Sequence, residues 1–155
     1  LTYWRESGMK QLSQKLKEQN PLLSITGIDF SEQMLKECEK KGVAKTLINS
    51  DFQRKAMPFE NERFDLAVSA GVFELLNRPD VVIGEISRVL KKGATYSFTS
   101  YAGDPKDYQC YRHEDNLIEG ALKNSGLSIK NKEFFFAFHS GKKPIHYHLY
   151  TGQKL

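Results

Sequence analysis

Two carboxylates follow short apolar runs in the first third of the chain. Asp29 comes directly after the run 22–28, and Asp51 follows the run Thr46–Ile48 by three residues. A carboxylate at the carboxyl end of a strand in an α/β unit can accept hydrogen bonds from a nucleotide. Carboxyl ends of parallel strands meet at one edge of a sheet, so the two side chains predict a nucleotide-binding edge.

Small residues follow a third apolar run. Ser69, Ala70, Gly71 and Val72 come after the segment Phe64–Val68, and small residues let the backbone approach a bound molecule closely. A second group of polar and aromatic residues flanks the end of a later predicted strand; its members are Tyr101, Tyr111, Arg112 and His113. We expect an acceptor molecule to approach there.

Helical and strand patterns alternate along the chain. Helices are predicted around Leu12 and Leu16, from Ser31 to Gly42, from Pro79 to Leu90 with Gly93 just beyond, and over His113–Asn124. Strands are predicted over Leu22–Ile28, Thr46–Ile48, Phe64–Ser69, Ala94–Ser100, Leu127–Phe138 and Ile145–Thr151. This alternation predicts an α/β fold with a doubly wound, mostly parallel sheet and an antiparallel edge hairpin.

Composition narrows the class of protein. A chain of 155 residues, 39% of them hydrophobic, predicts one domain over 1–155. It contains no apolar run long enough to cross a bilayer. The net charge of +4 is scattered rather than gathered on one face, so we expect neither nucleic acid nor a membrane as a partner. Cys38 and Cys110 form no disulfide framework or metal-ligand spacing, which indicates a reducing, cytoplasmic setting.

The closing strand contains two histidines that alternate with apolar residues. His146 and His148 share one predicted face, opposite Tyr147. Without a third ligand this spacing predicts no metal site.

Four segments carry a family resemblance when taken in order. They are ITGIDFSEQML, INSDFQRKAMPFENERFDLAV, ISRVLKKGATYSFTS, and the stretch from Cys110-Tyr111-Arg112-His113-Glu114 to Gly126-Leu127. Together they resemble the small-molecule branch of the class I S-adenosylmethionine-dependent methyltransferases. The resemblance implies a Rossmann-like fold, S-adenosylmethionine as the cofactor and methyl transfer to a small molecule.

The resemblance also implies roles for individual residues. Asp29 would accept from the ribose hydroxyls, and Asp51 from the adenine amine, with the Phe52 N–H meeting a ring nitrogen. Phe30 would pack on the adenine edge. The methionine part of the cofactor would be held by Ser69, Ala70, Gly71 and Val72. The substrate would be faced by Tyr101, Tyr111 and Arg112. The base would be His113 or Glu74.

Simpler interpretations stay open for several of these residues. Asp29 can cap the following helix, since turn and cap positions favour Asp. Phe30 and Phe52 can be ordinary packing residues. A capping role suits His113 as well as a substrate-facing one.

The glycine-rich turn of the family is not found upstream of Asp29, where the chain offers only Gly8. Either Leu1–Trp4 is the first strand and Arg5–Gly8 a degenerate turn, or the chain is a fragment that lacks part of its N-terminal region. We favour the second, because the first strand of this fold lies at the centre of the sheet. The alternatives to an enzyme of this family are a non-catalytic methyltransferase-like binding module and a nicotinamide dinucleotide dehydrogenase. The acceptor atom and the oligomeric state are not indicated.

Overall fold

The computed structural model describes residues 8–42, 44–108 and 110–155 and divides the chain into two compact units, Leu1–Lys55 and Ala56–Leu155. We describe each unit by itself. The prediction of one domain over 1–155 stays a prediction. The possible first strand, Leu1–Trp4, lies outside the described residues, and Gly8 is the first residue of a helix.

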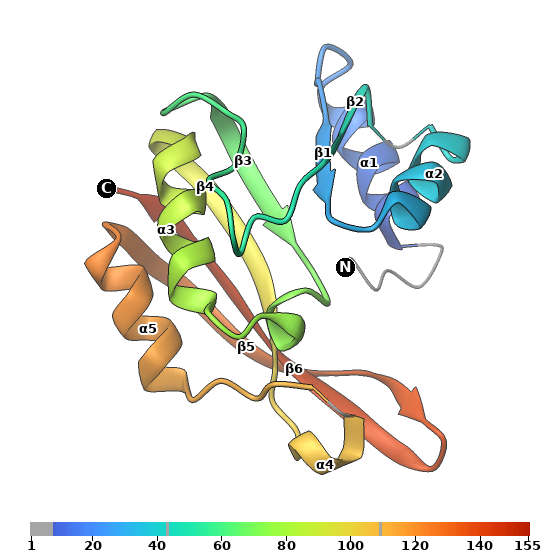
Figure 1. The fold of residues 1–155 in the computed structure, drawn as a ribbon, viewed down its shortest axis with the longest axis vertical. Coiled ribbons are helices and arrows are strands. Elements are labelled where there is room, and N and C mark those ends of the chain that lie inside the picture. The colour runs from blue at the N-terminus through green and yellow to red at the C-terminus, as the bar shows by residue number, and fades with distance from the viewer. Residues whose placement is uncertain (1–7, 43, 109) are drawn as a thin grey trace. The chain divides into compact units, whose positions relative to one another are not determined.

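The first unit contains two helices and a two-stranded parallel sheet (Figure 1). Its elements are α1 (Gly8–Gln19), β1 (Thr26–Asp29), α2 (Glu32–Lys40) and β2 (Thr46–Asn49). The predicted limits of α2 are confirmed: the Ser31 hydroxyl caps the helix by accepting from the Met34 amide at 3.4 Å. Gly42 then takes a positive φ of 61° that ends the helical path.

Strand β1 is shorter than the sequence predicted. Leu22 and Leu23 precede the strand, and Leu22 is 93% exposed. The reason is the turn around Pro21: the Asn20 side chain accepts from the Leu22 amide and the Asn20 carbonyl from the Leu23 amide. These bonds satisfy the backbone locally, so the strand begins only at Thr26.

The second unit is built on a four-stranded mixed sheet. Its elements are β3 (Phe64–Ser69), the 3₁₀ turn η1 (Phe73–Leu75), α3 (Pro79–Val89), β4 (Leu90–Tyr101), α4 (Pro105–Tyr108), α5 (Asp115–Asn124), β5 (Leu127–Ser140) and β6 (Lys143–Lys154). The strand order is β3-β4-β6-β5. β3 and β4 are parallel, whereas β6 runs antiparallel to both of its neighbours. The predicted α/β fold, with parallel strands and an antiparallel edge hairpin, is confirmed.

Several limits in this unit differ from the prediction: the strands extend further, β4 to Tyr101, β5 to Ser140 and β6 over Lys143–Lys154. β4 begins at Leu90, so Gly93, with a φ of 75°, lies inside a strand rather than just beyond a helix. Leu90 pairs with Phe64 in the sheet, and this pairing removes it from α3. The last helix begins at Asp115, which leaves His113 in the segment before it. The turn η1 and the short helix α4 were not predicted.

Helices α3 and α5 lie against the same face of this sheet (Figure 1). Beneath them the Phe98 ring stacks on Phe73 at 4.1 Å and on Tyr150 at 5.3 Å between ring centroids. All three side chains are at most 2% exposed. The start of the last helix is therefore placed over a dense aromatic core that includes the turn after β3.

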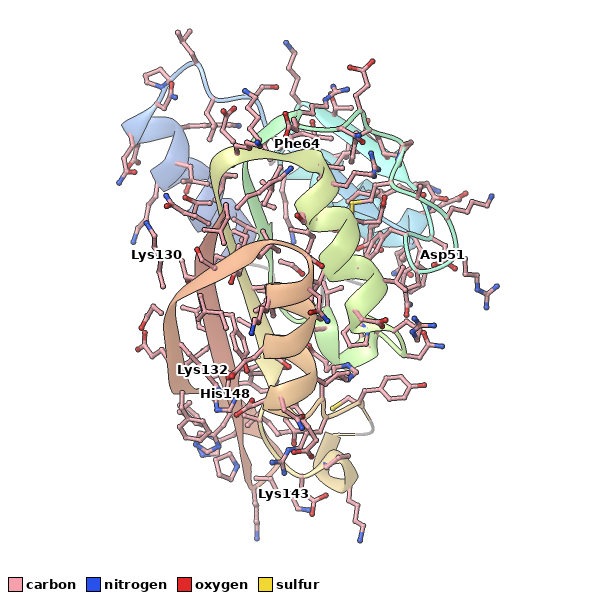
Figure 2. All side chains as sticks on the ribbon, turned by 90° about the vertical axis from the view of Figure 1, so that its left-hand side faces the viewer. Asp51, Phe64, Lys130, Lys132, Lys143 and His148 are labelled. Atoms are coloured by element: carbon pink, nitrogen blue, oxygen red, sulfur yellow. The ribbon has the colours of Figure 1, made fainter. Side chains whose placement is uncertain are left out.

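The first residue of α5 is tied to the sheet by its carboxylate. Asp115 accepts from the Tyr150 hydroxyl at 2.9 Å and from the Lys132 ammonium at 2.6 Å, and His148 Nδ1 lies 3.1 Å from it. Figure 2 shows Lys132 and His148 close together beside α5. His148 thus belongs to a structural ion-pair cluster. No group of three or more potential metal ligands occurs among the described residues.

Candidate functional site

In the first unit, the expected carboxylates lie at the carboxyl edge of the β1–β2 pair. Asp29 is the last residue of β1 and pairs in register with Asn49, the last residue of β2. Asp51 follows two residues later, and its side chain is 40% exposed. Because the strands are parallel neighbours, their carboxyl ends place the segments that hold Asp29 and Asp51 side by side.

Backbone bonds fix the position of Asp29. Its carbonyl accepts from the Ser50 amide at 3.0 Å, and its Oδ1 accepts from the Ser31 amide at 2.8 Å. The residue is 4% exposed. Asp29 therefore closes the turn that leads to Ser31, and Ser31 itself is the N-cap of α2.

Asn49 is a site residue that the sequence analysis missed. Its side-chain amide donates to the Phe30 carbonyl at 2.9 Å and to the Asp29 carbonyl at 3.4 Å. These bonds tie the end of β2 to the turn after β1. The only signal in the sequence was an amide side chain at a strand end, where its partners could not be known.

The aromatic residues beside the two carboxylates differ in burial. Phe30 is 44% exposed, whereas Phe52 is 7% exposed. Asp51 caps its own turn: its Oδ1 accepts from the Gln53 amide at 3.2 Å, and its Oδ2 lies 3.4 Å from Arg54 Nε. The exposed Phe30 ring is thus available for stacking, and Phe52 contributes packing together with its backbone.

In the second unit, the end of β3 leads into a tight turn. Ser69 is the last residue of the strand, Ala70 follows it, and Gly71 takes a positive φ of 68°. The Gly71 amide donates to the Thr99 hydroxyl of β4 at 2.9 Å. Val72, 5% exposed, turns the chain inward toward η1. A positive φ at this point favours glycine, because a Cβ would be strained there.

The turn η1 holds the segment that precedes α5. The Glu74 carbonyl accepts from the Tyr111 amide at 2.7 Å. His113 Nε2 lies 2.9 Å from the Phe73 carbonyl. A carbonyl only accepts, so Nε2 carries the proton, and Nδ1 of a neutral His113 imidazole is left as the acceptor. The structure thus brings Glu74, Tyr111 and His113 together, although about 40 residues separate them in the sequence.

Glu74 itself is buried. It is 1% exposed, and its Oε1 accepts from the Tyr147 hydroxyl at 2.6 Å. Its Oε2 has no hydrogen-bond partner within the described part of the chain. Burial raises the pKa of this carboxyl, and the hydrogen bond from Tyr147 opposes the shift. Tyr147 was predicted only to lie on the strand face opposite His146 and His148, so the contact of its hydroxyl was not foreseen from the sequence.

The three residues expected to face a substrate are placed differently. Tyr111 is 52% exposed, and its ring stacks on His113 at 6.1 Å between centroids. Arg112 is exposed as well. Tyr101 is 2% exposed, packs in a cluster with Ile145 and Tyr147, and donates its hydroxyl to the Asp104 carbonyl. This placement makes Tyr101 a core residue that supports the region from beneath, rather than a surface for a substrate.

Comparison with known proteins places this arrangement in a family. Residues 7–98 match the model of a family described as a methyltransferase domain. The chain is 26% identical over 140 residues to a malonyl-[acyl-carrier protein] O-methyltransferase of Enterobacter lignolyticus, covering 85% of this chain and 49% of that protein. It is 40% identical over 82 residues to a demethylmenaquinone methyltransferase of Staphylococcus aureus, covering 50% of this chain and 32% of that protein.

The fold is shared with solved structures at low sequence identity. A SAM-dependent methyltransferase of Methanosarcina mazei superimposes with a TM-score of 0.74 at 16% identity, over 91% of this chain and 86% of that chain. This similarity shows the Rossmann-like fold. The chain spans about half, or less, of the length of these curated relatives.

Proposed function

Because the chain belongs to the methyltransferase domain family, we propose that it transfers a methyl group from S-adenosylmethionine to a small-molecule acceptor. The family match over residues 7–98 is the observation that carries this proposal. Solved structures of S-adenosylmethionine-dependent enzymes with the same fold support this cofactor. The relatives' names refer to different acceptors, so they do not select one for this chain.

The residues of the first unit fit the adenosine part of this cofactor. Asp29, the last residue of β1, would accept from the ribose hydroxyls through its carboxylate. Asp51 would accept from the adenine amine, with the Phe52 N–H at a ring nitrogen. The exposed Phe30 ring would pack against the base.

The end of β3 fits the other part of the cofactor. Ser69, Ala70, Gly71 and Val72 leave the strand through a positive-φ turn with small side chains, which allows backbone groups to approach the methionine part. The glycine-rich turn of the family is not among the described residues. The proposed cofactor contacts are therefore, each taken within its own unit, those of residues 29–30 and 51–52 in the first unit and those of residues 69–72 in the second.

The chemistry requires positioning more than proton transfer. S-adenosylmethionine supplies a methyl group that is already activated on a sulfonium. The protein aligns the acceptor atom with that group and excludes water. Tyr111 and Arg112 are exposed and would contact the acceptor, with Tyr101 supporting them. If the acceptor is protonated, His113 would take the proton at Nδ1, because Nε2 donates to the Phe73 carbonyl.

The setting of the protein is also part of the proposal. Cys38 and Cys110 are both free thiols, which agrees with a reducing, cytoplasmic location. Across the described residues, no helix is both long enough and apolar enough to span a membrane. A small molecule rather than a nucleic acid or a membrane is the proposed partner.

Calorimetry tests the function directly. Purified protein is titrated with S-adenosylmethionine and S-adenosylhomocysteine, and in parallel with NAD. Saturable heat with the first two ligands alone supports the proposal. Heat with NAD alone would favour a dinucleotide enzyme, and no heat with any ligand at millimolar concentration would remove the enzyme hypothesis. Mass spectrometry of ligands that co-purify with the protein gives an independent result.

A further inference from the structure

A buried carboxyl lies behind the proposed acceptor site. Glu74 is 1% exposed, in the turn η1, and its Oε2 has no hydrogen-bond partner among the residues described. A carboxyl that exchanges a proton with an acceptor must reach that acceptor. The Glu74 side chain is closed off from solvent, so direct proton transfer from a substrate does not suit it.

Two hydrogen bonds of Glu74, together with a packing contact in the cluster of Tyr147, connect it to the segment that contains the exposed Tyr111. Its carbonyl accepts from the Tyr111 amide at 2.7 Å. Its Oε1 accepts from the Tyr147 hydroxyl of β6 at 2.6 Å. Tyr147 belongs to the apolar cluster against which Cys110 packs, one residue before Tyr111. Glu74 therefore holds the same segment in two ways, through its backbone and through its side chain.

We propose that Glu74 is a positioning residue, whose buried carboxyl anchors the turn η1 to Tyr147 and so fixes the segment Tyr111–His113 beside the end of β3. This inference deepens the proposed function, since it assigns Glu74 a part in shaping the acceptor site instead of a part as base. The effect on His113 is the largest, because the Phe73 carbonyl in the same turn fixes which of its ring nitrogens is protonated.

The charge state of Glu74 follows from its surroundings. Desolvation raises its pKa, and the Tyr147 hydrogen bond opposes this shift. Two titratable side chains interact with Glu74, namely Tyr147 on β6 and the Cys110 thiol. Burial is the main cause that raises the pKa of the Cys110 thiol to about 11. Desolvation is the largest of these effects, so burial shifts the balance of Glu74 toward its protonated form in the folded protein.

The direct test of this state is infrared spectroscopy. The difference spectrum between the wild-type protein and Glu74→Gln isolates the Glu74 carboxyl band at neutral pH. A protonated carbonyl stretch is expected. A carboxylate band would overturn the shift toward the protonated form. Glu133→Gln replaces an exposed glutamate on β5 and is the matched control for the subtraction.

The positioning role is tested by NMR, without knowledge of the acceptor. In Glu74→Ala and Tyr147→Phe, we expect the Tyr111 amide to exchange with solvent about tenfold faster, because the turn loses its side-chain anchor. The His113 ring is expected to lose its single tautomer. Glu74→Gln keeps an acceptor oxygen for Tyr147, so it should restore most of both signals.

Two outcomes separate the hypotheses. If Tyr111 exchange and the His113 tautomer stay as in the wild type in Tyr147→Phe and in folded Glu74→Ala, the positioning role is wrong. If both change only in proportion to a global loss of stability, measured by urea unfolding, Glu74 is merely structural. These readouts need no cofactor, so a protein that fails to bind S-adenosylmethionine can still support or refute the role of Glu74.

Discussion

Replacing Asp29 with asparagine tests the adenosine site most sharply, because the structure separates the two roles of this side chain. The Asp29 Oδ1 accepts from the Ser31 amide at 2.8 Å and caps the turn into α2. Asparagine also carries an Oδ1 acceptor, so Asp29→Asn retains this bond while it removes the negative charge. The variant therefore changes the proposed ribose contact more than it changes the fold.

The expected loss of affinity can be worked from the bonds. A hydrogen bond to a charged acceptor contributes about 1.5–3 kcal/mol, against about 1 kcal/mol for a neutral pair. Two ribose hydroxyls on one carboxylate thus lose about 2 kcal/mol in Asp29→Asn, which weakens the Kd about thirtyfold. The free energy of unfolding is expected to fall by only about 1 kcal/mol, because the Ser31 bond changes from charged to neutral.

Calorimetry with S-adenosylmethionine and urea unfolding measure the two quantities. Asp65→Asn is the matched control, because Asp65 is an 82% exposed side chain on β3 whose partner is the exposed Lys91. Its Kd should stay within about twofold of the wild-type value, since exposed pairs contribute little. Asp29→Ala also removes the oxygen that accepts from the Ser31 amide, so it should lower the free energy of unfolding by about 1–2 kcal/mol more than Asp29→Asn does. Equal affinity in Asp29→Asn and the wild type would refute the reasoning.

Three further predictions concern the second unit. Arg88 donates to the Glu85 carboxylate and to the carbonyls of Met57 and Phe59. Arg88→Lys should therefore lower the free energy of unfolding, measured by urea titration, by about 2 kcal/mol. An unchanged unfolding midpoint would show that contacts other than those of Arg88 hold the loop before β3. The pKa of Glu74 in the folded protein is raised above its ordinary value of 4.5, so its contribution to stability is full below pH 4.5 and is lost as the pH rises through the folded pKa. The free energy of unfolding of the wild type, relative to that of Glu74→Gln, should therefore fall as the pH rises from 4.5 through the folded pKa. The same pH dependence in both proteins would contradict the shift. Gly71→Ala places a Cβ at a φ of 68° and should cost about 1–2 kcal/mol and weaken S-adenosylmethionine binding, whereas an unaffected Kd would remove this turn from the site.

Local signals determined much of the architecture. Ser31 and Gly42 delimit α2 through a side-chain cap and a positive φ, and both depend only on residue type and near neighbours. The alternation of apolar residues predicted the strands, including the closing hairpin. The sequence therefore determined the fold class and placed Asp29 at the end of β1.

The predicted limits of elements were wrong where hydrogen bonds outside the apolar pattern, near or distant in the sequence, decided them. Leu90 continues an apolar helical pattern, yet its pairing with Phe64 draws it into β4. Leu22 belongs to an apolar run, yet the turn closed by Asn20 leaves it exposed. Periodicity describes one segment at a time, so it could not weigh these competing bonds.

The amino-acid sequence alone determined which residue types reach the carboxyl ends of the strands, because strand ends and helix caps follow from neighbours a few positions apart. Only the tertiary structure decided which groups distant in the sequence pack and hydrogen-bond together. It buried Glu74 against Tyr147, 73 residues away, and set His113 on the Phe73 carbonyl, 40 residues away. Desolvation and hydrogen bonding depend on which segments pack together, and no local pattern encodes that.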